Sequence, residues 1–126
     1  MALLVNASVA LAGDLRDPVG RLTARLGYDG HLRDASGRTV LRFEADGDVR
    51  DPAGRKVFAL GARGEVRNAA GAQLGVIGAD GAVRDRHGKL LGRVESDGDV
   101  RDASGRLIGT ARDVRRAWAG LYYFFW

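Results

Sequence analysis

The sequence contains no cysteine, only two prolines and only two histidines among its 126 residues. The lack of cysteine excludes a disulfide scaffold, a thiolate metal site and thiol chemistry. Few prolines and 45% apolar residues exclude a collagen-like or disordered chain. His31 and His87 occupy different positions of the repeat described below, and no nucleophile-elbow or phosphate-loop pattern occurs. We therefore expect a folded protein that is not an enzyme and uses no cofactor.

Long apolar runs are also missing. Residues 1–13 carry no charged side chain, and no run approaches the roughly 20 apolar residues that a membrane-spanning helix needs. The first residues resemble a signal peptide only faintly, because no Lys or Arg precedes the apolar stretch and Asn6 and Ser8 interrupt it. We expect these residues to belong to the mature protein and the protein to be cytoplasmic.

The charges show no concentration of one sign along the chain. Twenty basic and 16 acidic residues give a net charge of +4, and residues 13–111 hold 17 basic and 15 acidic residues. Nucleic-acid-binding domains gather basic residues on one face, often with aromatic residues between them. The nearly neutral body of this chain therefore predicts no nucleic-acid partner.

Glycine, in contrast, is abundant and follows two grids with a period of 17 residues. The first grid is Gly13, Gly30, Gly47, Gly64, Gly81 and Gly98, and the second is Gly20, Gly37, Gly54, Gly71, Gly88 and Gly105. Between the grids the pattern G-x-[LV]-R-[DN]-x-x-G occurs six times without insertion or deletion. The chain therefore divides into an apolar N-terminal strand or cap at residues 1–12, six β-repeats at residues 13–111 and a C-terminal segment at residues 112–126.

Each repeat is predicted to form strand, turn, strand, turn. Sequences such as Asp-Pro-Ala-Gly are typical of a type I turn that ends on a glycine with positive φ, so the grid glycines are predicted to lie in turns. The strands carry three apolar columns. They are Leu15, Leu32, Val49, Val66, Val83 and Val100; Thr23, Val40, Val57, Leu74, Leu91 and Ile108; and Leu26, Phe43, Leu60, Ile77, Val94 and Ala111.

The second and third columns are three residues apart, so they cannot share one face of a regular strand. Either both faces are covered or a bulge intervenes. The column between them is Ala24, Leu41, Phe58, Gly75, Gly92 and Gly109, where glycine makes a bulge or bend plausible.

Two all-β architectures fit this repeat. In a β-solenoid, each 17-residue repeat is one of six stacked coils; in a meander, each repeat is a hairpin added to an antiparallel sheet. A solenoid must keep every turn above its neighbour, whereas a meander tolerates length changes. The strict period therefore favours the solenoid, with the antiparallel hairpin meander as the alternative.

The C-terminal segment combines an amphipathic helix with an aromatic tail. Ala111, Val114, Trp118, Leu121 and Phe125 recur at three- and four-residue spacing. Six of the nine aromatic residues in the chain lie in its last nine residues. This segment is expected to cap the repeats, to join copies of the protein, or to lie on a membrane surface.

Acidic residues beside the turns were considered as metal ligands. Asp46-Gly47-Asp48 and Asp97-Gly98-Asp99 lack the alternating oxygen ligands and the terminal glutamate of an EF-hand. Turn chemistry accounts for these aspartates, so no metal site is predicted, and an ion held along an aspartate column stays an open alternative.

The repeat Gly98-Asp-Val-Arg-Asp-Ala-Ser-Gly-Arg-Leu-Ile-Gly109 resembles tandem repeats in short uncharacterised bacterial proteins, some of which also end in an aromatic run. That resemblance covers residues 13–126 and implies no established activity. The coil length and the absence of cysteine are also similar, more loosely, to bactofilins, bacterial cytoskeletal proteins whose β-solenoids polymerise end to end. The second likeness implies filament formation.

We therefore expect a non-enzymatic structural protein that associates with itself, end to end, into rods or filaments. The expected interface consists of Leu3, Leu4, Val5, Val9, Trp118, Leu121, Tyr122, Tyr123, Phe124, Phe125 and Trp126. The alternative is a monomeric or dimeric binding module attached to a membrane surface through its aromatic and arginine-containing C-terminus. No small-molecule substrate is predicted in either case.

Overall fold

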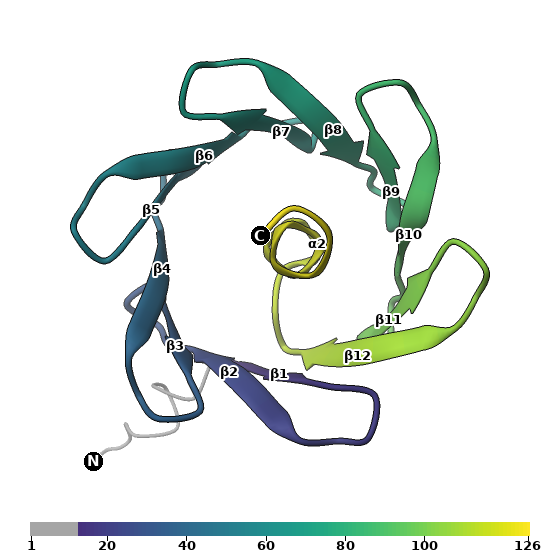
Figure 1. The fold of residues 1–126 in the computed structure, drawn as a ribbon, viewed down its shortest axis with the longest axis horizontal. Helices are drawn as coiled ribbons and strands as arrows, with labels where there is room; N and C mark the ends of the chain where they lie inside the picture. The colour runs from purple at the N-terminus through teal and green to yellow at the C-terminus, as the bar shows by residue number, and fades with distance from the viewer. Residues whose placement is uncertain (1–12) are drawn as a thin grey trace, which may run out of the picture.

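The computed structural model describes residues 13–126, which form twelve antiparallel strands and one C-terminal helix. Each strand pairs with the next, and the last strand pairs with the first, so the sheet closes into a barrel. Figure 1 shows the hairpin loops projecting outward from this ring, with the helix seen end-on at its centre. The predicted β-solenoid is therefore wrong, and the alternative hairpin meander fits.

The strands form six hairpins, numbered 1 to 6 in chain order. They are β1 (Gly13–Arg16) with β2 (Leu22–Leu26), β3 (His31–Asp34) with β4 (Thr39–Phe43), β5 (Asp48–Arg50) with β6 (Lys56–Leu60), β7 (Glu65–Asn68) with β8 (Gln73–Ile77), β9 (Ala82–Asp85) with β10 (Leu90–Val94), and β11 (Asp99–Asp102) with β12 (Leu107–Arg112). The helix is α2 (Arg116–Phe124). It lies within the residues whose three- and four-residue spacing predicts a helix.

The strict 17-residue period has a different cause from the one expected. A solenoid must keep its turns stacked, but a closed ring imposes an equally strict requirement, because every hairpin must span its share of the same circumference. The arginine of the repeated pattern forms a column of its own, the arginine column, and in the ring its six members lie on six different hairpins. They are Arg16, Arg33, Arg50, Arg67, Arg84 and Arg101. The repulsion between stacked arginines that a solenoid would create therefore does not arise.

The loop at the outer end of each hairpin, here called the hairpin tip, is built around an Asp or Asn. In hairpin 1, Oδ1 of Asp17 accepts hydrogen bonds from the backbone N–H groups of Val19 at 3.0 Å and Arg21 at 2.9 Å. Asn68 accepts the equivalent pair of bonds in hairpin 4, both at 3.0 Å. A side-chain oxygen that satisfies two backbone donors explains why this column contains only Asp and Asn.

A bulge occurs in every hairpin. In hairpin 2, Leu32 lies opposite Leu41 and Arg33 lies opposite Thr39, which leaves Val40 as the extra residue. The same shift in the other hairpins leaves out Thr23, Val57, Leu74, Leu91 and Ile108. A bulge, one of the two explanations offered for the odd spacing, is thus present, but the extra residue belongs to the second apolar column and not to the glycine-containing column after it.

The turns that join one hairpin to the next, here called the inner turns, lie at residues 27–30, 44–47, 61–64, 78–81 and 95–98. Gly47, in one of them, has a φ of 98°, and a Cβ there would meet the carbonyl oxygen of Leu60. Glycine is required at this position both for its backbone conformation and for space. At the hairpin tips, Gly37 has a φ of 91° with open space around it, so only the conformation requires glycine.

Eleven of the twelve grid glycines have positive φ, whereas Gly13 is the first residue of β1. The first apolar column, from Leu15 to Val100, is at most 1% exposed. Together with most of the third column it lines the inside of the barrel. The core was therefore visible in the repeat pattern.

Helix α2 fills the barrel. Ala119 and Leu121 are fully buried against the strands, and Trp118 stacks on Phe43 with 4.7 Å between ring centroids. The residue before the helix, Arg115, provides no side-chain cap, and the first turn contains no acidic residue. A nine-residue helix without caps is unstable on its own, so its packing inside the ring stabilises it.

The glycines of the column that follows each bulge accommodate the aromatic tail. A Cβ added at Gly75 would lie 2.7 Å from the ring of Phe125, and one added at Gly92 would lie 2.5 Å from the ring of Phe124. Gly109 faces Tyr123 in the same way, at 2.6 Å. Hairpins 1 to 3 instead carry Ala24, Leu41 and Phe58 at this column. Glycine in hairpins 4 to 6 therefore makes the room that the three aromatic rings occupy.

Tyr123 also joins the two ends of the sheet. Its hydroxyl lies 2.7 Å from the carbonyl oxygen of Arg16 on β1 and 2.9 Å from that of Thr110 on β12. These two residues face each other where the first strand pairs with the last. Burial raises the pKa of Tyr123, so its hydroxyl stays protonated and can donate its hydrogen to this pair of carbonyls.

We expect Tyr123→Phe to lower the free energy of unfolding by about 1 kcal/mol, because the two carbonyls lose their donor. Urea denaturation followed by circular dichroism measures this change. Tyr122→Phe is the matched control, since the Tyr122 ring packs edge-on against Tyr123 but its hydroxyl does not reach the closing strands. Equal stability of the two variants would show that the hydroxyl does not hold the ring closed.

Candidate functional site

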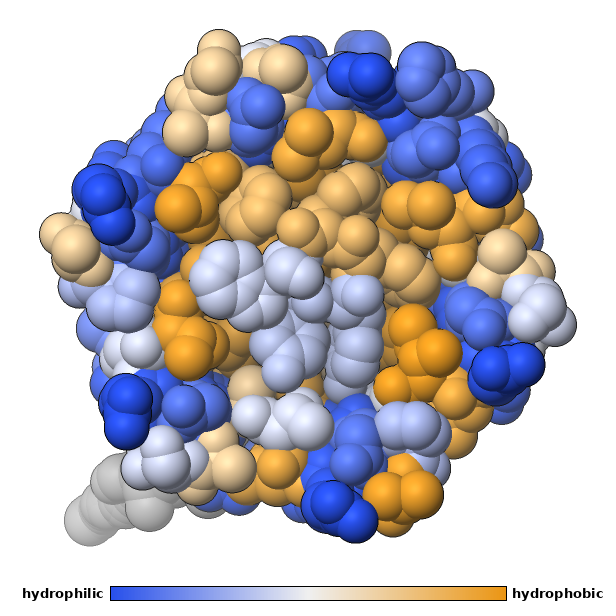
Figure 2. All heavy atoms as spheres, in the orientation of Figure 1, coloured by the Kyte–Doolittle hydropathy of each residue, from blue (hydrophilic) through white to orange (hydrophobic). Residues whose placement is uncertain are grey.

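One end of the barrel presents an apolar surface. The C-terminal residues Tyr122, Tyr123, Phe124 and Phe125 are half-buried there, and Trp126 is 55% exposed. Around them lie the half-buried bulge residues of hairpins 2 to 6, which are Val40, Val57, Leu74, Leu91 and Ile108. Figure 2 shows this arrangement as separate apolar groups over the hairpins, encircling paler side chains at the centre. We call this surface the aromatic face.

The direction of helix α2 shows at which end of the barrel the aromatic face lies. The helix begins beside an inner turn, where the guanidinium of Arg116 donates a hydrogen bond to the carbonyl oxygen of Ala79. It ends beside Gly92 and Gly75, which lie in the middle of their strands and so are closer to the hairpin tips than Ala79 is. The aromatic face is therefore at the end nearer the hairpin tips, and the inner turns are at the opposite end.

The outer segments of the hairpins are more basic than the rest of the chain. The outer segments of the hairpins contain thirteen basic and five acidic residues, a net charge of +8. These segments are residues 16–22, 33–39, 50–56, 67–73, 84–90 and 101–107. The rest of the chain contains seven basic and eleven acidic residues, a net charge of −4. A basic rim thus surrounds the aromatic face.

The conserved spacing of the arginine column has a structural role in the tips. In five hairpins the guanidinium donates a hydrogen bond to the carbonyl oxygen of the tip glycine. The pairs are Arg16 with Gly20, Arg50 with Gly54, Arg67 with Gly71, Arg84 with Gly88 and Arg101 with Gly105, at 3.0 to 3.2 Å. These bonds hold the positive charges close to the tips instead of leaving them on mobile side chains.

Asp51, Asp85 and Asp102 at the hairpin tips remain charged at neutral pH. Hydrogen bonds from the backbone N–H of Arg55 lower the pKa of Asp51 from its ordinary value of 3.8, and that of Lys89 lowers the pKa of Asp85. The hydroxyl of Ser104 does the same for Asp102. Because these carboxylates accept hydrogen bonds within their own loops, their charges serve the turns. Arg55 and Lys89, which follow Asp51 and Asp85 in these loops, are exposed.

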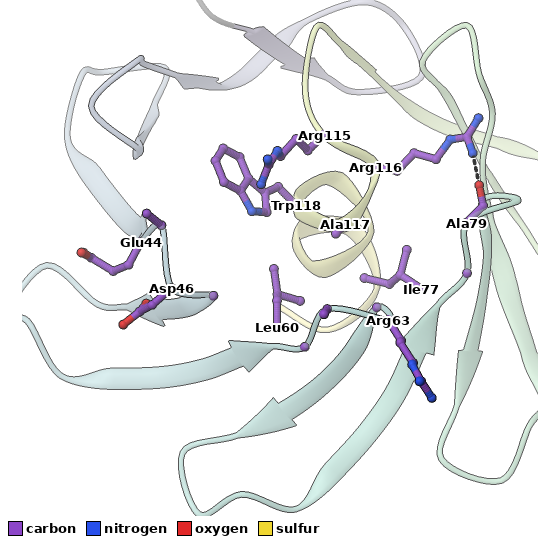
Figure 3. A pocket seen from close by; sticks show the side chains of 16 residues that line it. Glu44, Asp46, Leu60, Arg63, Ile77, Ala79, Arg115, Arg116, Ala117 and Trp118 are labelled. Atoms are coloured by element: carbon purple, nitrogen blue, oxygen red, sulfur yellow. Dashed lines mark hydrogen bonds between the residues drawn. The ribbon is translucent and has the colours of Figure 1, made fainter.

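The opposite end of the barrel contains a groove of about 610 Å³ beside the start of helix α2. Figure 3 shows Leu60, Ile77, Ala117 and Trp118 around this groove, with the charged ends of Glu44 and Asp46 directed away from the helix. Arg115 lies over the Trp118 ring, with its guanidinium carbon 5.2 Å from the ring centroid. The residues that line the groove include no nucleophilic side chain paired with a base.

Neither histidine lies in a chemical site. Nδ1 of His31 is 3.1 Å from the hydroxyl of Thr39, and Nε2 of His87 is 3.3 Å from Nε of Arg86. Within residues 13–126, no cluster of three His, Cys, Asp or Glu side chains has the arrangement of a metal site. The same residues include no helix of the length and apolarity needed to cross a bilayer.

The structure brings together part of the interface expected from sequence. Tyr122, Tyr123, Phe124, Phe125 and Trp126 lie together on the aromatic face. Leu121 is fully buried, and Trp118 packs near the other end of the helix, so both belong to the core. The remaining predicted residues, Leu3, Leu4, Val5 and Val9, lie outside the described residues.

Two features of this face were not recognised in the sequence. The bulge column is apolar and was assigned to the strands, but its exposure follows from its position beside the tips. The basic rim was missed because charge was summed over the whole chain. Every repeat alternates a basic outer segment with a more acidic inner one, so the sum is nearly neutral. Summing the charge by position in the repeat, instead of over the whole chain, reveals the separation.

A family model described as a 5-fold beta-flower protein matches residues 12–126. No curated protein and no solved structure gives a match. The family's description refers to fivefold, whereas the described residues of this chain form six hairpins. The match agrees with the resemblance to small tandem-repeat proteins. The likeness to bactofilins rested on a solenoid architecture, whereas this fold is a closed ring of antiparallel hairpins.

We expect Asp51→Asn to keep the tip of hairpin 3 intact, because Asn68 accepts the same two backbone bonds in hairpin 4. The carboxylate of Asp51 has a lowered pKa, so its charged form stabilises the fold above pH 4 and this contribution is lost as the pH falls below that value. Thermal melting should therefore show any stability advantage of wild type over Asp51→Asn shrinking below about pH 4. Asp51→Ala, which removes the acceptor, should melt lower than both at pH 7. Equal melting of Asp51→Ala and wild type would contradict the role of this column.

Proposed function

The chain belongs to the 5-fold beta-flower protein family, and we propose that it is a non-enzymatic module that binds the surface of anionic membranes through its aromatic face. The observation that carries this proposal is the combination of an apolar centre with a basic rim at one end of the barrel. Aromatic and aliphatic side chains enter the boundary between headgroups and acyl chains, and basic side chains around them attract anionic lipids.

The apolar part of the face is large for a surface that faces only water. It includes the exposed Trp126, four other aromatic residues of the tail and five aliphatic bulge residues. Contiguous apolar patches on soluble proteins generally mark an interaction surface. Tryptophan and tyrosine are favoured at membrane interfaces because their rings are amphipathic.

The rim supports an anionic rather than a neutral partner. Each basic residue held near an anionic bilayer contributes roughly 1 kcal/mol of attraction at physiological salt. The outer segments carry a net charge of +8, while the rest of the chain carries −4. The resulting axial asymmetry favours an orientation with the aromatic face toward the membrane and the inner turns away from it.

The closed ring gives this face a fixed shape. Each strand is paired on both sides, and the helix that supports the aromatic residues is packed inside the barrel. The aromatic side chains are therefore already in place, and binding does not require a tail to fold first. This distinguishes the proposed module from an amphipathic segment that becomes helical only on the membrane.

A second candidate is the end-to-end self-association expected from sequence. The charge difference between the two ends favours it, because the basic end of one copy would face the acidic end of the next. In this case the ring would form rods without lipid. Negative-stain electron microscopy of the purified chain tests this directly: filaments with a regular axial repeat support it, and discrete single particles exclude it.

Trp126→Ser should weaken binding to vesicles of phosphatidylglycerol and phosphatidylcholine by roughly tenfold, because the most exposed aromatic ring of the face is lost. Tyr28→Ser is the matched control, since Tyr28 is 68% exposed on an inner turn at the other end of the barrel. Vesicle sedimentation measures both affinities, and circular dichroism checks that both variants are folded.

Binding of the wild type should also fall as salt is raised, and vesicles of phosphatidylcholine alone should bind much more weakly. No sedimentation of the wild type with anionic vesicles would sink the membrane proposal. Equal weakening by Trp126→Ser and Tyr28→Ser would exclude the aromatic face as the contact surface.

A further inference from the structure

The arginines of the column are not equivalent. In hairpins 1, 3 and 6 the guanidinium also pairs with the carboxylate two residues earlier in the chain. The pairs are Arg16 with Asp14 at 2.9 Å, Arg50 with Asp48 at 3.3 Å and Arg101 with Asp99 at 3.1 Å. In hairpin 2, Arg33 pairs with Asp29 at 3.0 Å. A carboxylate therefore neutralises each of these four guanidinium groups.

Arg67 and Arg84 differ from these four. Each still donates to its tip carbonyl, at 3.2 Å and 3.1 Å, but neither forms an ion pair within residues 13–126. At the position two residues before Arg84 the chain has Ala82. Before Arg67 it has Glu65, whose carboxylate accepts a hydrogen bond from the backbone N–H of Arg63 instead. Both arginines are exposed, whereas the four paired ones are partly buried.

The tip of hairpin 4 also lies in a stretch of the chain without acidic residues. No acidic residue occurs from Val66 to Ala79, because hairpin 4 has Asn68 where the other tips have Asp. The tip of hairpin 5 adds two further basic residues, Arg86 and Lys89. Over the outer segments of these two adjacent hairpins, four basic residues are set against one acidic residue, Asp85.

The aromatic tail packs against the same pair of hairpins. The ring of Phe125 lies against Gly75 of hairpin 4, and the ring of Phe124 lies against Gly92 of hairpin 5. Two guanidinium groups held at the tips and two aromatic rings therefore occupy one sector of the aromatic face. A lipid with a phosphate above its acyl chains offers the complementary arrangement, anionic outside and apolar inside.

We propose that Arg67 and Arg84 bind the phosphate groups of anionic phospholipids, so that hairpins 4 and 5 form the leading edge of the membrane contact. This inference depends on the proposed function and specifies which part of the face makes the contact. Each guanidinium is already held by its tip carbonyl, and its remaining N–H groups are available for phosphate oxygens.

The test compares two double variants with equal change of charge. Arg67→Gln with Arg84→Gln removes the two unpaired guanidinium groups, and Arg16→Gln with Arg101→Gln removes two that are paired with carboxylates. Both variants lose two positive charges and two tip hydrogen bonds. Affinity for phosphatidylglycerol vesicles should fall on the order of 20-fold in the first variant and less than about threefold in the second.

A third variant tests the inference without removing an arginine. Ala82→Asp places a carboxylate two residues before Arg84, as in hairpins 1, 3 and 6, and is expected to weaken vesicle binding about fivefold. Circular dichroism establishes which variants are folded. If the first double variant is unfolded, the vesicle affinity of Ala82→Asp tests the inference in its place.

The outcomes separate the two proposals. Equal loss of affinity in the two double variants, or unchanged binding of Ala82→Asp, would show that only total charge matters and overturn the inference while leaving membrane binding intact. A wild-type chain that fails to bind anionic vesicles overturns both. Inorganic phosphate at millimolar concentration should not compete, because a free phosphate lacks the acyl chains; full competition would identify a free-phosphate site and also overturn the inference.

Discussion

The packing of three aromatic rings against three glycines is the interaction on which the rest of the molecule depends. Tyr123, Phe124 and Phe125 reach the strands only where Gly109, Gly92 and Gly75 leave room for them. This contact holds an uncapped nine-residue helix inside the ring, and the helix supplies the apolar filling that a barrel of six short hairpins needs. The same packing places the aromatic residues of the tail on the outer face of the barrel.

The repeat and its asymmetry have separate roles. The Asp or Asn of each tip, the bulge and the inner glycine build six similar hairpins and so position a uniform ring. Differences among the hairpins then distinguish one side of the ring from another. At the column after the bulge, hairpins 1 to 3 carry Ala24, Leu41 and Phe58, whereas hairpins 4 to 6 carry glycines against which the aromatic tail packs. A scaffold of equivalent parts thereby acquires a single orientation.

Much of the local structure could be predicted from the sequence. The period, the turn at Asp51-Pro-Ala-Gly54 and the presence of a bulge in each hairpin depend on neighbouring residues, and the pattern predicts them. Closure could not be predicted in this way, because the pairing of β1 with β12 joins residues nearly 100 positions apart and no local signal encodes it. The match of Gly75, Gly92 and Gly109 to three aromatic residues was present in the sequence, but its meaning depends on the helix lying inside the ring. The basic rim likewise appears only when the six outer segments are brought to one end.

The contact between Tyr123 and the first and last strands also has a consequence for biosynthesis. Of the twelve strands, β1 leaves the ribosome before the others, whereas its partner β12 and the helix that braces the seam follow all of them. Early hairpins can form as they emerge, yet an incomplete ring exposes an unpaired edge and an empty bore. The ring can therefore close only after Tyr123 has left the ribosome, and a chain that stops before Tyr123 would remain an open sheet.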